Sequence, residues 1–221
     1  MCELNKIELV TLAEECFENG QYVNVITYMK EVIRLECPLN FSERLLIFDS
    51  FFELKNPFYN ILENENINER LHNDTIINAE KAVCNLCKDA IYLLDKNPVE
   101  KDISKESIAD YKWFEGVQYH DLALCAINNG NDEYKNKALQ LYKEARRIAD
   151  DWVNAAHPVR LCIANSYCDL LSALLDNDEE ALRISKDAYD KAFPCINNLS
   201  NSLKDRAEEE LQHLREKNEQ I

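Results

Sequence analysis

Apolar residues recur every three or four positions along almost the whole chain, which is the spacing of one face of an α-helix. Polar turn signals such as Asn19-Gly20, Asn97-Pro98 and Asn128-Asn129-Gly130 interrupt this pattern. The pattern predicts about nine helices and no strands. Their expected ranges are 3–17, 21–35, 42–54, 74–95, 106–125, 133–152, 158–174, 178–196 and 200–217.

Individual residues are expected to set the ends of these helices. Ser42 is placed to cap the third helix. Asn56-Pro57 is expected to break or kink the pattern after it, because the residue before a proline avoids the α region. Pro158, after His157, lies in the first turn of the seventh helix, where its missing N–H costs nothing. Because the turns are short and polar, we predict antiparallel helices in an all-α chain, organised as one domain over residues 1–221.

Composition narrows the classes of function. Three Gly among 221 residues supply few of the positive-φ positions that β-hairpins and Gly-rich phosphate loops need. The net charge of −16 argues against a nucleic acid or a membrane surface as partner, because both require a basic face on the protein. An acidic surface instead favours basic or neutral partners.

The nine cysteines are scattered and odd in number, and the N-terminus shows no secretory pattern. We therefore expect reduced thiols in a cytoplasmic protein, with the nucleus as an alternative. Cys84-x-x-Cys87 is the only close cysteine pair, and it lies on an apolar helix face, so a packing role is expected. We see no nucleophile with a base, no metal-ligand spacing and no cofactor motif. The expectation is a protein that is not an enzyme and has neither metal nor cofactor.

Several segments of the chain resemble the 14-3-3 family in their order and spacing. The strongest spans Ala138 to Ala192, with ALQLYKEARRIADDW, HPVRLCIANSYCDLLSALL and ALRISKDAYDKAF. Residues 12–30, 39–46 and 106–119 carry the rest, so the resemblance covers most of the chain. It implies a cup of about nine antiparallel helices with a concave groove. It also implies a usually dimeric, non-enzymatic adaptor that holds peptide segments of client proteins.

The resemblance also assigns positions in that groove. The family binds phosphoserine or phosphothreonine with a Lys, two Arg and a Tyr, through charge-assisted bonds. Its Arg-Tyr pair falls here on His120 and Asp121, and its helix-five Lys falls on Trp113. The family's client-binding Asn residues fall on Ser166 and Lys217. The candidate groove positions are Phe52, Lys55, Tyr59, Trp113, His120, Asp121, Asn165, Ser166, Asp169, Leu211, Leu214 and Lys217.

These replacements change the expected chemistry of the groove. A carboxylate at residue 121 would repel a phosphate by roughly 1–4 kcal/mol. The apolar wall of the family's ninth helix becomes Glu209, Glu210 and His213. His120 and Asp121 are adjacent and point about 100° apart on a helix, so we expect a surface pair rather than a catalytic dyad. Trp113 is either a platform in the groove or an aromatic residue of the core, and we favour the platform.

Three functions stay open on this basis. The first is an adaptor that binds client segments with weak or lost dependence on phosphate. The second is a reader of phosphorylated peptides with a relocated basic pocket, for which Lys55, Arg160 and His120 are the candidates, although an ion pair is the simpler role for Arg160. The third is a helical scaffold whose groove is vestigial or filled by its own charged tail.

The sequence leaves both a homodimer and a monomer open. In the family, charges on the first helix pair with residues on the fourth helix of the partner. The corresponding positions on the fourth helix are Thr75, Asn78 and Ala82, none of which is charged.

Overall fold

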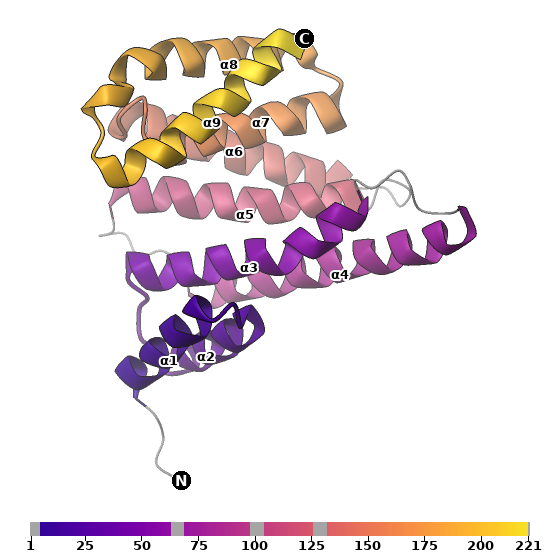
Figure 1. Ribbon diagram of the computed structural model, residues 1–221, viewed down its shortest axis with the longest axis vertical. Helices are drawn as coiled ribbons and strands as arrows, with labels where there is room; N and C mark the ends of the chain where they lie inside the picture. The colour runs from indigo at the N-terminus through magenta and orange to yellow at the C-terminus, as the bar shows by residue number, and fades with distance from the viewer. Residues whose placement is uncertain (1–4, 63–68, 98–103, 126–131, 221) are drawn as a thin grey trace. The chain divides into compact units, whose positions relative to one another are not determined.

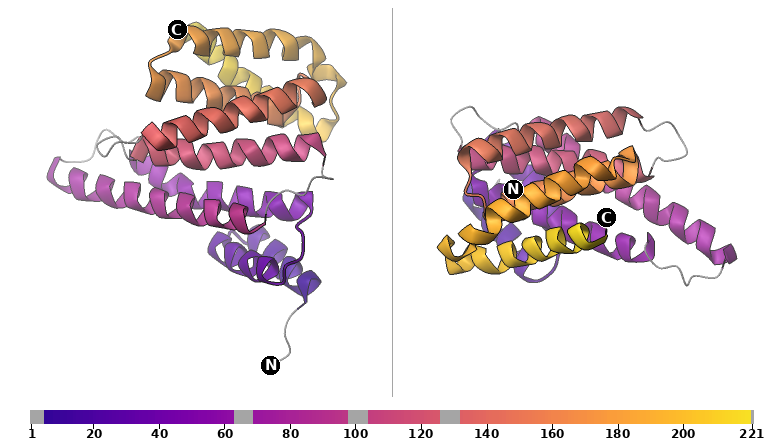
Figure 2. Two further views of the ribbon diagram at one scale, coloured as in Figure 1. Left: turned by 180° about the vertical axis from the view of Figure 1, so that it is seen from behind. Right: turned by 90° about the horizontal axis from the view of Figure 1, so that it is seen from above.

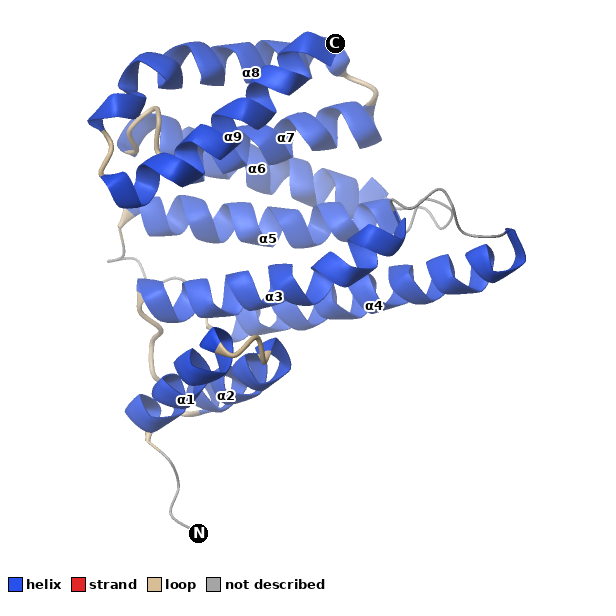
Figure 3. Cartoon of the chain, in the orientation of Figure 1, coloured by secondary structure: helices blue, strands red, loops and turns tan. Residues whose placement is uncertain are grey.

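The computed structural model describes residues 5–62, 69–97, 104–125 and 132–220. Within these ranges the chain is all-α, with nine α-helices, one 3₁₀ helix and no strand (Figure 3), which confirms the predicted fold class. The elements are α1 (Lys6–Glu18), α2 (Tyr22–Arg34), α3 (Phe41–Leu62), α4 (Glu69–Lys96), α5 (Lys105–Cys125), α6 (Asp132–Trp152), α7 (Pro158–Leu175), α8 (Asp178–Ala192), η1 (Phe193–Asn198) and α9 (Asn201–Gln220).

The chain divides into two compact units, Met1–Pro98 and Val99–Ile221, and each is described by itself. The single domain over residues 1–221 stays a prediction, as does the cup shape. None of the helices within the described ranges is long and apolar enough to cross a membrane. The eight cysteines in those ranges are free thiols. Cys87 is buried and Cys84 is half-buried, in keeping with a packing role.

In the first unit, α1 and α2 form a helical hairpin, and α3 pairs with α4 (Figure 1). Both helices of the hairpin also contact α3. The core between them is apolar and closed to solvent. Its fully or almost fully buried members include Ala13, Val25, Met29, Val32 and Phe51.

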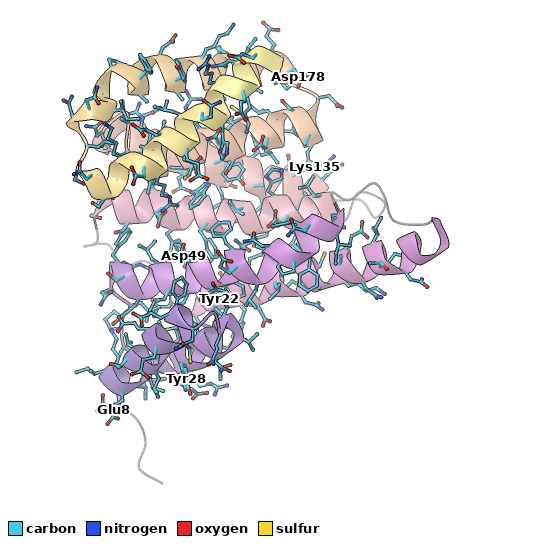
Figure 4. The ribbon with its side chains drawn as sticks, viewed as in Figure 1. Glu8, Tyr22, Tyr28, Asp49, Lys135 and Asp178 are labelled. Atoms are coloured by element: carbon cyan, nitrogen blue, oxygen red, sulfur yellow. The ribbon has the colours of Figure 1, made fainter. Side chains whose placement is uncertain are left out.

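Side-chain caps fix the starts of α1 and α3. At α1, Asn5 Oδ1 accepts a hydrogen bond from the Glu8 amide at 3.1 Å, and the Glu8 carboxylate accepts from the Asn5 amide at 2.9 Å. Glu8 lies in the first turn of this helix (Figure 4). The same reciprocal box joins Asn40 and Glu43 at α3, with distances of 2.9 and 2.8 Å. The prediction that Ser42 caps α3 was therefore wrong, because Asn40 satisfies these amides and the helix already includes residue 42.

Pro57 does not end α3, which continues to Leu62. A proline inside a helix removes one backbone hydrogen bond, and the helix axis bends toward its C-terminal end (Figure 1). The predicted break was wrong, whereas the alternative of a kink agrees with this bend.

In the second unit, α5 and α6 lie side by side as the most extensive helix pair (Figure 2). α7 packs on both of them, α8 packs on α7, and α9 crosses α7 and α8 (Figure 1). α5 is consequently buried on several sides. Its buried residues include the polar side chains of Asp110, Gln118, His120 and Asp121.

The ends of α7 and α8 follow the sequence signals only in part. His157 caps α7 and Pro158 occupies its first turn, as predicted. Asn177 caps α8, which begins at Asp178 (Figure 4). However, α8 ends at Ala192 rather than near residue 196, and the chain continues as the 3₁₀ helix η1. Pro194 explains the early end, because it has no N–H to donate to the preceding turn.

Candidate functional site

Gly116 lets α5 approach α6 closely in the middle of the second unit. A Cβ atom on this residue would lie 2.7 Å from Cε1 and 2.8 Å from Cδ1 of Tyr142. Tyr142 has no exposed surface, so its ring has little room to move away. The glycine therefore sets where the buried hydroxyl of Tyr142 meets α5 and α7.

Polar side chains from α5 and α7 gather around that hydroxyl. His120 Nδ1 lies 3.3 Å from Tyr142 Oη, and the two rings meet edge to face. Trp113 Nε1 donates to Ser166 Oγ at 2.9 Å, and Ser166 also hydrogen-bonds to Tyr142. We call Trp113, His120, Asp121, Tyr142 and Ser166 the α5–α7 polar cluster.

The electrostatics of this cluster keep Tyr142 neutral. Burial raises the pKa of Tyr142 well above its ordinary value, and the negative charges of Asp121 and Asp169 raise it further. The hydrogen bond from Ser166 opposes the shift without reversing it. A neutral phenol beside two carboxylates is an unfavourable place for an additional anion.

Beside the cluster, side chains of α7 contact α9. Asp169 forms an ion pair with Lys217, with Oδ1 and Nζ 3.0 Å apart. Asn165 Nδ2 donates to the backbone oxygen of Glu210 at 3.0 Å and to its carboxylate at 2.7 Å. The predicted positions Asn165, Asp169 and Lys217 therefore lie along the contact between α7 and α9, and Glu210 joins them. The printed partners of Ser166 lie instead on α5 and α6.

Leu211 and Leu214 lie elsewhere. Leu214 is fully buried, and its carbonyl oxygen accepts a hydrogen bond from Ser185 Oγ of α8 at 3.0 Å. Leu211 lies 5% exposed, in a small pocket lined by Tyr189, Phe193 and other residues of α8, η1 and α9. Both leucines help to hold α9 against its neighbours, and their contact with a client stays a prediction.

In the first unit, Phe52, Lys55 and Tyr59 share one face of α3. The Lys55 ammonium lies 5.3 Å from the ring centroid of Phe52 and 5.8 Å from that of Tyr59. Its side chain is fully buried. Aromatic faces stabilise a cation at such distances, so both rings help to hold the ammonium of Lys55.

Three sequence-based interpretations can be compared with these positions. His120 and Asp121 are each only 8% exposed, so the expected surface pair was wrong. They are buried because α5 is covered on more than one side. Arg160 forms the expected structural ion pair, 2.7 Å from Asp150. Trp113 is 7% exposed and hydrogen-bonded to Ser166, and its role as a groove platform stays a prediction.

Sequence reasoning missed Tyr142 and the contact of Glu210 with Asn165. Tyr142 belongs to an apolar helix stripe, where an aromatic residue is ordinarily read as core. The available signal was Gly116, because a lone glycine inside a helix often marks a close approach. Nothing comparable in the sequence indicates the Asn165–Glu210 contact, which joins residues 45 positions apart.

Residues 10–220 match the family model described as "14-3-3 protein". The chain belongs to the 14-3-3 family. Three 14-3-3 proteins that it resembles are 25–29% identical to it, which fits a divergent member. They include 14-3-3-like protein 2 of Caenorhabditis elegans, 26% identical over 90% of this chain and 85% of the relative. The 14-3-3 protein beta/alpha of Xenopus tropicalis is 25% identical over 91% of this chain and 87% of the relative. The 14-3-3 protein I of Plasmodium falciparum is 29% identical over 57% of this chain and 48% of the relative.

Membership of the 14-3-3 family establishes the general function. These proteins are non-enzymatic adaptors that bind segments of client proteins, which are often phosphorylated.

Proposed function

We propose that this 14-3-3 protein binds client segments with little or no dependence on phosphate. The observation that carries the proposal is Asp121, a carboxylate buried beside Tyr142 at a position where the family resemblance expects a phosphate-binding tyrosine. Two negative groups a few ångströms apart repel by roughly 1–4 kcal/mol at realistic dielectric constants. This repulsion would offset much of the binding free energy that a phosphate gains from its other contacts.

The neighbouring residues support the same conclusion. Trp113 stands where the family has a lysine, and its single N–H is already donated to Ser166 at 2.9 Å. His120 stands where the family has an arginine, and its Nδ1 lies within hydrogen-bonding distance of Tyr142. Neither residue offers the bidentate, permanently charged fork with which arginine binds phosphate.

Two cations of the second unit are already paired with carboxylates. Lys217 lies 3.0 Å from Asp169, and Arg160 lies 2.7 Å from Asp150. A phosphate would have to compete with these carboxylates for the same ammonium and guanidinium groups. The arrangement of Arg160 gives no support to a relocated pocket built on that residue.

The proposal is tested with pairs of short peptides that differ only in a phosphate on a central serine. We expect isothermal titration calorimetry to give dissociation constants within about threefold of each other for each pair that binds. A preference of about tenfold or more for the phosphorylated partner, about 1.4 kcal/mol, would contradict the proposal. If Lys55→Glu then abolished that preference, a relocated basic pocket would be the better explanation.

A gain-of-function variant makes the test sharper. Replacing His120 with Arg and Asp121 with Tyr removes the carboxylate and supplies a guanidinium. We expect the double variant to prefer phosphorylated peptides more strongly than the parent does, by about tenfold, because Arg–phosphate hydrogen bonds are charge-assisted. His120→Asn is the matched control, and circular dichroism checks that each variant is folded. If no peptide binds either protein, a scaffold without a working site is favoured.

A further inference from the structure

We infer that His157 is a pH-sensitive cap of α7, which holds the first turn of that helix while its ring is neutral and releases it when the ring is protonated. The inference goes beyond the proposed function, because this histidine is not part of the α5–α7 polar cluster. His157 lies directly before α7, and its ring reaches the first turn of α5.

The first turn of α7 leaves one amide for this ring to satisfy. Pro158 has no N–H. The backbone oxygen of His157 accepts from the amides of Arg160 and Leu161 at 3.0 and 3.3 Å. The amide of Val159 donates instead to His157 Nδ1, 3.4 Å away. Val159 is only 6% exposed, so losing this acceptor would leave its amide poorly satisfied by water.

The acceptor role of Nδ1 fixes where the ring carries its proton. A ring nitrogen accepts only through its lone pair, so the proton of the neutral ring lies on Nε2. Nε2 is 3.1 Å from Oε1 of Glu106, in the first turn of α5, and donates to it. The His157 side chain is 14% exposed. The neutral ring therefore joins the starts of two helices, with one nitrogen accepting and the other donating.

Protonation is incompatible with half of this arrangement. A proton on Nδ1 would face the N–H of Val159, so that two donors meet and the amide loses its acceptor. The new positive charge would also lie at the N-terminal end of α7, where the helix dipole disfavours a cation. The contact of Nε2 with Glu106 survives, because it requires only the N–H that both forms of the ring possess. Acid therefore removes the cap of α7 and leaves the contact with α5.

The charges around the ring act in opposite directions. Burial lowers the pKa of His157 below its ordinary value, Glu106 on α5 raises it, and Arg206 on α9 lowers it further. On α7 itself, the guanidinium of Arg160 is paired with Asp150 at 2.7 Å. The net lowering keeps the ring neutral in the folded protein at neutral pH.

The sign of the pH dependence follows from this lowering. The unfolded chain takes up the proton at a higher pH than the folded chain does. The stabilisation by the neutral cap is therefore complete above the ordinary histidine pKa of about 6.5 and is lost as the pH falls below it.

Nuclear magnetic resonance on the ¹⁵N-labelled full chain tests the inference directly. At pH 7.5 we expect the ring of His157 to carry its proton on Nε2. Between pH 7.5 and 5.0 the exchange protection of the Val159 amide, corrected for the intrinsic pH dependence of exchange, should fall about fivefold or more. A proton on Nδ1 at pH 7.5, or protection that does not change, would overturn the inference.

His157→Asn separates the cap from other effects of acid. Asparagine is a good N-cap and stays neutral throughout this range, so protection of Val159 should change by less than about twofold. His213→Asn is the matched control, because it removes a histidine of α9 whose side chain is 50% exposed. It should keep the loss seen in the parent. An equally large loss in His157→Asn would show that another group is responsible.

Glu106→Gln tests the role of the neighbouring charge. Glutamine still accepts from Nε2 but no longer attracts the protonated ring, so the titration midpoint of His157 should move about half a pH unit lower. Glu133→Gln changes an exposed glutamate at the start of α6, the end of that helix away from His157, and should leave the midpoint in place. Equal midpoints in Glu106→Gln and the parent would overturn the arrangement of the ring between α5 and α7.

Discussion

At the scale of single residues, Gly116 and Tyr142 determine how the polar cluster is assembled. A Cβ at residue 116 would overlap the Tyr142 ring at 2.7 Å, and that ring is fully buried and linked to His120 and Ser166. The glycine costs helix stability, since alanine is about 1 kcal/mol better inside a helix. Gly116 permits the close approach of α6 that places the Tyr142 hydroxyl against α5, and this packing compensates for the lost helix stability.

Gly116→Ala is therefore expected to destabilise the protein despite the better helix propensity. Overpacking a core costs up to about 3 kcal/mol, so after the helical gain of about 1 kcal/mol we expect a net loss of up to about 2 kcal/mol. Urea unfolding followed by circular dichroism measures the change. In a Tyr142→Leu background the loss should shrink, because the atoms that clash are absent. A variant as stable as the parent would contradict this account.

At the scale of helices, ion pairs connect α6, α7 and α8. Arg146 lies 3.1 Å from Asp187 of α8 and 3.5 Å from Asp150, which in turn binds Arg160 of α7. Lys191 lies 2.8 Å from Asp187. Burial alone would raise the pKa of Asp187, but the hydrogen bond and charge of Lys191, together with Arg146, lower it below its ordinary value.

The direction of that shift predicts how stability depends on pH. Because the folded state lowers the pKa of Asp187, its charge stabilises the fold above the unfolded-state pKa. That contribution is lost as the pH falls through the folded-state pKa. Asp187→Asn should cost about 0.5–1 kcal/mol at neutral pH, and this cost should shrink as the pH falls through the lowered pKa of Asp187.

Urea midpoints across this pH range measure the effect. Asp190→Asn, an exposed change on the same helix, is the control and should show little dependence on pH. If Asp187→Asn destabilises the protein as much in acid as at neutral pH, the ionised carboxylate is not the source of the stabilisation.

At the scale of the whole molecule, domain organisation can be tested by unfolding. We predict a single domain over residues 1–221, whereas the chain divides into two compact units of a size that can fold alone. Differential scanning calorimetry should give one transition, with equal calorimetric and van't Hoff enthalpies. Two separable transitions, assignable by cleavage near residue 98, would contradict the single domain.

Much of the fold could be predicted because its signals are local. The apolar repeat and Asn-, Gly- or Pro-containing turns located all nine helices, and His157-Pro158 marked the start of α7. The errors occurred where two local signals competed. Ser42 was predicted to cap α3, where Asn40 does so instead, and Asn56-Pro57 was expected to break or kink a helix that continues beyond it.

The candidate site was less predictable, because its chemistry depends on distant pairs. The sequence and the family resemblance indicated that the cations expected for phosphate are replaced by His120, Asp121 and Trp113. Their burial and partners did not follow from helix periodicity, which describes one helix at a time. α5 is covered on several sides, and this is why His120 and Asp121 are buried rather than exposed.

The sequence by itself determined the all-α class, the approximate positions of the helices and the negative charge of the chain, since these follow from local spacing and composition. Only the tertiary structure decided which polar groups meet. Trp113 binds Ser166 from 53 positions away, His120 contacts Tyr142, and Asn165 binds Glu210 across two helices. Such contacts depend on how helices pack, and packing is set jointly by side chains far apart in the chain.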